Sequence, residues 1–218
     1  MRSDSTARQK MSENLLNGIN ATKLPREFYI RDTLRIAREL LGKIFVRKIG
    51  GKTLAGRIVE TEAYIAGKDE SAHSSRGKTK RNATMFEEGG VLYVYFTYGM
   101  YHCANVVTGE KEEGNAVLLR AIEPLEGIEA FAFNRFGKTE ITEKEKRNLL
   151  SGPGKICMAY GLTKKEDGTD LLGDEIFILD VPPLSDEKIV QTTRIGISKS
   201  KDFPWRFYEK DNPYVSKK

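Results

Sequence analysis

The chain has 218 residues, 39% hydrophobic and 31% charged, which is enough to bury a real core in one globular domain or at most two small ones. Lysine and arginine total 36 against 31 acidic residues, giving a net charge of +5. This sign suits a polyanionic partner, although ordinary solubility charge also explains so mild an excess. The two cysteines, Cys103 and Cys157, form no CxxC pattern, which favours a reducing compartment and argues against a disulfide scaffold.

The sequence shows neither a membrane span nor a signal peptide. No apolar run approaches the ~18 residues of a membrane span. The polar start, "MRSDSTARQKMSENLLNGIN", lacks the apolar region of a signal peptide. We therefore expect a flexible N-terminal tail at residues 1–22, one domain at 23–218, and no membrane partner.

The first half of the chain is dominated by strand patterns. Asp32 is placed to cap a helix that stops at Gly42. Two hairpins should follow, one turning at Gly50–Gly51 and one near Gly99. The long polar stretch between them, 65–90, is typical of a functional or disordered loop. The expected elements are a helix at 33–41 and strands at 43–49, 53–64, 91–98 and 100–107.

Helical patterns are more frequent in the second half. Thr142 and Glu145 form a capping-box pattern before one of these helices. The expected elements are strands at 116–124, 175–180 and 193–198 and helices at 125–136, 143–150 and 156–161. Strands dominate the first half of the chain and helices are interspersed among them. This order predicts a single α+β domain built around a mostly antiparallel sheet.

The stretch "RIVETEAY" puts Glu60, Glu62 and Tyr64 on one face of a strand, because strand side chains alternate with period two. One explanation is an exposed strand face that needs charge. The other is a carboxylate that acts on a substrate held by the neighbouring ring.

Metal and phosphate motifs are weak in this sequence. The two histidines, His73 and His102, stand in no zinc-binding pattern, so we expect no metal site. "SGPGK" is not a P-loop, since Leu149 replaces the first glycine. Lys155 at a helix start could still bind an anion. A plain helix start with Pro153 in its first turn explains the same pattern.

Tyrosines crowd into the second hairpin. Tyr93, Tyr95, Tyr98 and Tyr101 are good strand formers, and packing alone would explain most of them. Tyr98, however, stands beside the turn glycine, where packing contributes little to the stability of an aromatic side chain. Aromatic tips serve as wedges in proteins that unstack bases, and basic stretches such as 76–81 lie nearby in sequence. A carboxylate beside a ring then indicates an enzyme that acts on an extruded base.

Several long motifs strengthen this interpretation. "GRIVETEAYIAGKDESAHS", "RNATMF", "LYVYFTYGMYHCANV", "AVLLRAIEPLEG", "SGPGK" and "RIGI" occur in the order found in the alkyladenine (3-methyladenine, N-methylpurine) DNA glycosylase family. The chain resembles this family from about residue 26 to 209. The resemblance implies a curved sheet with surrounding helices and a protruding β-hairpin that inserts into DNA. It also implies a cofactor-free, monofunctional glycosylase of base excision repair, which flips out 3-methyladenine, 7-methylguanine, ethenoadenine or hypoxanthine and hydrolyses the N-glycosidic bond.

The resemblance assigns roles at the reacting centre. Glu62 matches the catalytic acid that activates the water, which leaves Glu60 a structural role. Arg120 and the main-chain oxygen of Ile195 match the other ligands of that water.

The resemblance also assigns base and DNA contacts. Tyr64, His73 and Tyr95 match the residues that enclose the flipped base. Asn105 matches a gate against the exocyclic amine of guanine. The expected DNA contacts are the intercalating Tyr98, together with Thr79, Met85 and Lys155.

These residue types suit the chemistry. A glycosidic bond breaks through a positively charged sugar, which a carboxylate such as Glu62 can stabilise while it takes a proton from water. We expect Arg120 to keep Glu62 ionised. Electron-rich rings attract purines made cationic by alkylation. For a neutral base the leaving group must be protonated, and no residue stands out as the acid.

Two rival functions remain open at this point. A carbohydrate hydrolase could use Glu60 and Glu62 as a pair of carboxylates. A non-catalytic nucleic-acid binder would explain the charge and the aromatics but not Glu62 with Arg120. A lyase activity would need a lysine near the sugar, and none stands out. We expect a monomer that binds damaged double-stranded DNA, cytoplasmic and nucleoid-associated in a bacterium or nuclear in a eukaryote.

Overall fold

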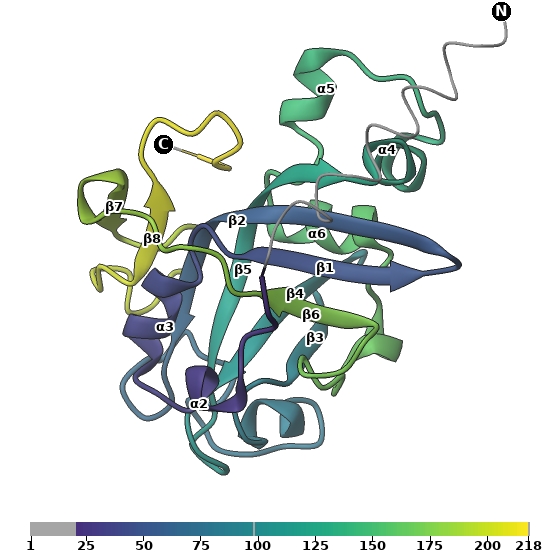
Figure 1. Ribbon diagram of the computed structural model, residues 1–218. Helices are drawn as coiled ribbons and strands as arrows, with labels where there is room; N and C mark the ends of the chain where they lie inside the picture. The colour runs from purple at the N-terminus through teal and green to yellow at the C-terminus, as the bar shows by residue number, and fades with distance from the viewer. Residues whose placement is uncertain (1–20, 98, 218) are drawn as a thin grey trace, which may run out of the picture.

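One curved antiparallel sheet organises the protein (Figure 1). The computed structural model describes residues 21–97 and 99–217. The main path through the sheet is β3-β4-β5-β2-β1-β6, and β8 pairs with both β2 and β7. The strands are β1 (Ile44–Ile49), β2 (Lys52–Tyr64), β3 (Leu92–Thr97), β4 (Tyr101–Thr108), β5 (Asn115–Glu126), β6 (Ile176–Leu179), β7 (Ile189–Thr192) and β8 (Arg206–Glu209). The predicted α+β class is confirmed.

Short helices surround the sheet. They are α2 (Arg26–Tyr29), α3 (Thr33–Glu39), α4 (Ile128–Phe136), α5 (Glu143–Arg147) and α6 (Pro153–Tyr160), with 3-10 turns at Ala83–Phe86, Lys164–Glu166 and Asp186–Lys188. Asp32 caps α3 by accepting from the N–H of Arg35 at 2.8 Å, as the sequence predicts. The capping box of Thr142 and Glu145 also forms. Within the described ranges, no helix is long and apolar enough to cross a membrane.

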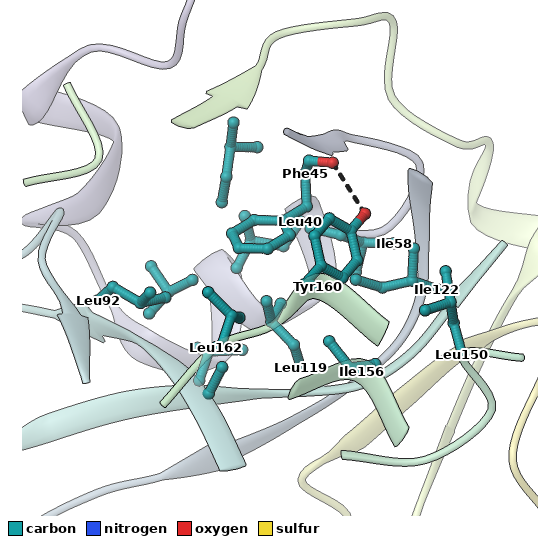
Figure 2. Close-up of a cluster of buried hydrophobic side chains, with 14 of the residues drawn as sticks. Leu40, Phe45, Ile58, Leu92, Leu119, Ile122, Leu150, Ile156, Tyr160 and Leu162 are labelled. Carbon is teal, nitrogen blue, oxygen red and sulfur yellow. Dashed lines mark hydrogen bonds between the residues drawn. The ribbon is translucent and has the colours of Figure 1, made fainter. Parts of the chain in front are cut away.

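The main hydrophobic core joins α3, α4 and α6 to the sheet, and Figure 2 shows its centre. Tyr160 of α6 is fully buried and donates its hydroxyl to the carbonyl of Phe45 at 3.1 Å. The rings of Phe45 and Phe131 pack against it with centroids 5.1 and 4.7 Å away. Anchored in this way, α6 packs against β4 and β5, and the loop before it accepts a hydrogen bond from Ile122 of β5 through the carbonyl of Leu150.

Three irregularities interrupt the ladder between β2 and β5, and two of them flank Glu60. The register runs from Ile58 opposite Ile122 to Glu60 opposite Ala121, and then to Thr61 opposite Leu119. Arg120 is therefore the extra residue of a bulge on β5. Bulges re-aim side chains and are common next to active sites. This bulge turns Arg120 toward the two glutamates of β2.

The structure differs from the predicted elements mainly in three places. The predicted strand at 193–198 is irregular, because Arg194 is drawn into a buried ion pair and Gly196 takes a left-handed φ of 76°. The true strand is β7, just before it, and β8 lies in a tail that showed us no strand pattern. The helix predicted at 125–136 starts only at Ile128, since Gly127 ends β5 with a left-handed φ of 78°.

Candidate active site

Strand β2 carries two carboxylates into the interior. Glu60 and Glu62 both have no exposed surface. The explanation of this motif as an exposed, charged strand face is therefore wrong. The shared side predicted for Glu60, Glu62 and Tyr64 agrees with their contacts, because Arg120 reaches both carboxylates and the Tyr64 hydroxyl reaches Glu62. Thr61 points the other way and donates to the carbonyl of Ala37 in α3.

Glu62 is held by three donors from separate parts of the chain. The main-chain N–H of Ile195 donates to Oε1 at 2.8 Å, and the Tyr64 hydroxyl donates to Oε2 at 3.0 Å. Nη1 of Arg120 reaches Oε2 only at 3.5 Å. Burial outweighs these donors and raises the pKa of Glu62. Arg120 lowers the pKa of Glu62, as its charge leads us to expect, but does not offset the effect of burial.

A cavity of about 350 Å³ opens beside these groups. Three residues that contact Glu62, namely Tyr64, Arg120 and Ile195, line it. Strand β3, strand β4 and the long loop after β2 supply most of the other walls. The lining residues are Tyr64, Ser71, His73, Met85, Tyr93, Tyr95, Thr97, Cys103, Asn105, Leu118, Arg120, Pro153, Ile195, Gly196 and Ile197.

Aromatic rings form one side of the cavity. His73 and Tyr95 meet edge to face with centroids 4.3 Å apart. Nδ1 of His73 lies 3.1 Å from the hydroxyl of Tyr93. Burial, helped by the charge of Arg81, lowers the pKa of His73. The imidazole is therefore uncharged near neutral pH.

Asn105 closes the cavity from β4. Its side chain is buried, and Nδ2 donates to the carbonyl of Tyr93 at 3.2 Å on the paired strand. This bond fixes the carboxamide against the cavity wall.

The sequence comparisons are consistent with this geometry. A family model described as methylpurine-DNA glycosylase (MPG) matches residues 27–213, most of the chain. The chain belongs to the methylpurine-DNA glycosylase family. Every residue that lines the cavity falls inside the matched range. The protein is therefore a DNA glycosylase, a hydrolase of N-glycosyl bonds with a role in DNA repair.

Curated relatives of this glycosylase match over nearly their whole length. The chain is 49% identical over 203 residues to a protein of Clostridium botulinum (strain Alaska E43 / Type E3), covering 89% of this chain and 99% of that one. It is 48% identical over 204 residues to one of Clostridium perfringens (strain SM101 / Type A), at 90% and 100% coverage. It is 50% identical over 196 residues to one of Carboxydothermus hydrogenoformans (strain ATCC BAA-161 / DSM 6008 / Z-2901), at 89% and 99%. All three carry the name "Putative 3-methyladenine DNA glycosylase".

The structure brings together eight of the residues that the sequence analysis assigned to the site. Tyr64, His73, Met85, Tyr95, Asn105, Arg120 and Ile195 line the cavity, and Glu62 contacts three of them. Their chemical roles remain predictions.

Among the described residues, Thr79 and Lys155 were also assigned to the site and do not line this cavity. Thr79 forms a turn with the side chain of Asn82. Lys155 donates to Ser151 at 3.2 Å and to Asn148. Pro153 is the first residue of α6, as one explanation of "SGPGK" predicts. Tyr98 lies outside the described residues.

Sequence reasoning missed several supporting residues. Asn82 donates to the carbonyl of His73 at 2.8 Å and so holds the loop that carries the imidazole. Arg194 pairs with Asp69 in full burial and stacks its guanidinium 4.7 Å from the ring centre of Tyr64. Their partners are too distant in sequence to show a pattern. Tyr93 was noted among the tyrosines of the second hairpin but given no role at the site, although it lies two positions from Tyr95 on the same strand face.

Proposed function

We propose that this glycosylase flips a damaged purine from duplex DNA into the cavity and hydrolyses its N-glycosidic bond with a water activated by Glu62. The observation that carries the proposal is one fully buried carboxylate, fixed by Ile195 and Tyr64 beside an aromatic cavity. The cavity volume of about 350 Å³ is near the lower end for small-molecule sites, roughly 300–1,000 Å³, which suits a single heterocycle.

Glu62 is suited to accept a proton from water. A raised pKa makes the ionised carboxylate a stronger base. The water oxygen bonds to C1′ of the sugar, the proton passes to Glu62, and the base leaves with the electrons of the broken C–N bond. The same carboxylate stabilises the positive charge that the sugar gains. Arg120 and the main-chain oxygen of Ile195 would hold the water in line.

The aromatic walls suit alkylated purines. Tyr64, His73 and Tyr95 would enclose the base, and the faces of such rings attract a cation by roughly 0.5–2 kcal/mol. Because His73 is uncharged near neutral pH, it would not repel a cationic base. The proposed substrates are 3-methyladenine, 7-methylguanine, ethenoadenine and hypoxanthine. Asn105 would exclude guanine through contact with its exocyclic amine.

The end of the β3-β4 hairpin suits contact with DNA. Phe96, Met100 and Tyr101 are exposed there, although large apolar side chains are usually buried. Apolar wedges of this kind enter the minor groove in other proteins that bend DNA. Tyr98 stands between these residues in the chain, and its role as the intercalating residue rests on the sequence resemblance. The proposed contacts of Thr79, Met85 and Lys155 with DNA rest on sequence as well.

A monofunctional reaction fits the lining of the cavity. A lyase reaction needs an amine close to the sugar. No lysine lines the cavity among the residues that the structure describes. We also propose that the protein acts as a monomer, in the cytoplasm with the nucleoid or in the nucleus, according to the source cell.

Base release tests the proposal. The protein is incubated with duplexes that each hold one ethenoadenine, hypoxanthine, 3-methyladenine or 7-methylguanine, and free base is separated and identified. We expect free modified base and an intact strand with an abasic site. Release of undamaged purines at the same rate, or strand cleavage without added base or heat, would contradict it.

A further inference from the structure

Arg120 divides its guanidinium between two buried carboxylates. Its Nε lies 3.1 Å from Oε1 of Glu60, while its Nη1 lies 3.5 Å from Oε2 of Glu62. The shorter contact is to Glu60, whose other partners, Arg206 and Ser216, do not line the cavity, whereas Glu62 contacts three residues that do. Glu60, more than Glu62, therefore sets the position of Arg120 beside the reacting centre.

Glu60 itself is held by the C-terminal part of the chain. Arg206 of β8 donates from Nε to Oε1 at 2.7 Å, and the main-chain N–H of Ser216 donates to Oε2 at 2.7 Å. Arg206 also donates to the main-chain oxygen of Lys217, which fastens that segment to β8. With Arg120, these donors surround a carboxylate that has no exposed surface.

We propose that Glu60 is a positioning residue, which draws Arg120 away from Glu62 and so leaves Glu62 free to accept a proton from the attacking water. The proposal rests on the proposed role of Glu62 as the base. Without the pull of Glu60, Arg120 could turn and pair fully with Glu62, as arginine forks do with single carboxylates. A carboxylate in such a pair is a weaker base.

The charged and polar groups around Glu62 decide whether its pKa rises or falls when the charge of Glu60 is removed. Four groups lie around the Glu62 carboxylate. Arg120 comes from β5, the Ile195 N–H comes from the segment after β7, and Tyr64 and Glu60 come from β2, the strand of Glu62 itself. Of these, only Glu60 is negative, and its charge contributes to the raised pKa of Glu62. Removing that charge lowers the pKa of Glu62 twice over, by ending the repulsion and by freeing Arg120.

Glu60→Gln tests the proposal through the pH dependence of the reaction. Single-turnover base release from an ethenoadenine duplex is measured across the acid range, with the full chain. The acid limb is the part of the pH profile in which the rate falls as the pH falls. We expect the acid limb of the variant to move to lower pH by roughly one unit, which is the pKa shift that one nearby opposite charge produces. The plateau rate should fall as well, because the base is weaker.

Glu209→Gln is the matched control. Glu209 lies on β8, close to Arg206 in sequence, and its carboxylate pairs with Arg57 at 3.0 Å. It does not line the cavity, so the control loses a partly buried ion pair without touching Arg120. Its acid limb should stay where the parent has it. Thermal unfolding of both variants shows whether each is folded at the assay temperature.

Ser216→Pro gives an independent test that keeps every charge. Proline has no N–H, so Glu60 loses one donor and its charge is less compensated. Ser216→Ala keeps the N–H, and the difference between the two variants reports that hydrogen bond alone. We expect the acid limb to move to higher pH in Ser216→Pro than in Ser216→Ala, opposite in direction to Glu60→Gln.

Two results would overturn the positioning role. One is a folded Glu60→Gln variant whose rate falls evenly at all pH values, since a merely structural loss leaves the acid limb in place. The other is identical acid limbs for Ser216→Pro and Ser216→Ala, and this second pair decides the matter if Glu60→Gln does not fold. Failure of the proposed function is separate, because it would appear as full activity in Glu62→Gln.

Discussion

The main-chain N–H of Ile195 donates to Oε1 of Glu62 at 2.8 Å, across 133 positions of sequence. A hydrogen bond to an ionised carboxylate stabilises the charged form. It also fixes the direction in which the other oxygen, Oε2, points. The irregular segment after β7 therefore acts on the reacting centre through its backbone, which no side-chain motif reveals.

Ile195→Pro removes this N–H and keeps an apolar side chain. We expect the ionised form of Glu62 to lose a stabilising donor, so its pKa rises further and the acid limb of base release moves to higher pH. Ile195→Val retains the N–H and is the comparison. Single-turnover rates across the acid range measure the effect. Equal acid limbs for the two variants would show that the Ile195 hydrogen bond does not affect the pKa of Glu62.

The parent enzyme should lose activity at a higher pH than an ordinary glutamate would allow. Burial raises the pKa of Glu62, and the base must be ionised, so the rate falls as pH falls through that raised value. The acid midpoint should lie above about 4.3, the usual value for glutamate. Measured single-turnover rates with a cationic lesion, which needs no protonated leaving group, isolate this limb. A midpoint at or below the usual value would contradict the burial argument.

Asp69→Asn should weaken the fold more than it changes the chemistry. Asp69 and Arg194 are both fully buried and pair with each other. Removing one partner of a buried ion pair leaves the other charge buried and unpaired, which lowers the free energy of unfolding by about 3–5 kcal/mol. Urea unfolding measures the loss, and Glu70→Gln serves as control because the Glu70–Lys199 pair next to it is largely exposed. Equal midpoints for the two variants would refute the difference in cost.

DNA binding should weaken steeply with salt. Each phosphate that the basic residues neutralise releases counterions, which gives a slope near −0.9 per phosphate in a plot of log affinity against log salt. Fluorescence anisotropy with an undamaged duplex from low to physiological salt measures the slope. A flat dependence would mean that the net charge of +5 serves solubility only.

Sequence patterns predicted the parts of this structure that local physics decides. Asp32 as a cap and the capping box at Thr142 depend on residues three positions apart, so their geometry was visible in the sequence. The same holds for the side of β2 shared by Glu60 and Glu62. Seven of the fifteen residues that line the cavity were also assigned to the site, but through the family resemblance and not through spacing.

Long-range contacts decided the rest. The burial of Glu60 depends on Arg206 and Ser216, more than 140 positions away, and no local pattern links them. The segment around Ile195 has strand-forming residues, yet the Arg194–Asp69 pair draws it out of the sheet. Tertiary pairing of charges overrode propensity there.

The central claim is that Glu62 is the catalytic base, and one comparison tests it most directly. Glu62→Gln and the control Glu209→Gln are each mixed in excess with a duplex that holds one ethenoadenine, and single-turnover base release is followed beside binding. We predict that Glu62→Gln binds the damaged duplex but releases base at least 100-fold more slowly than the parent, within the range of about 10²–10⁴ for a lost general base. Release by Glu62→Gln within a few-fold of the parent rate would contradict the claim and remove Glu62 from the mechanism.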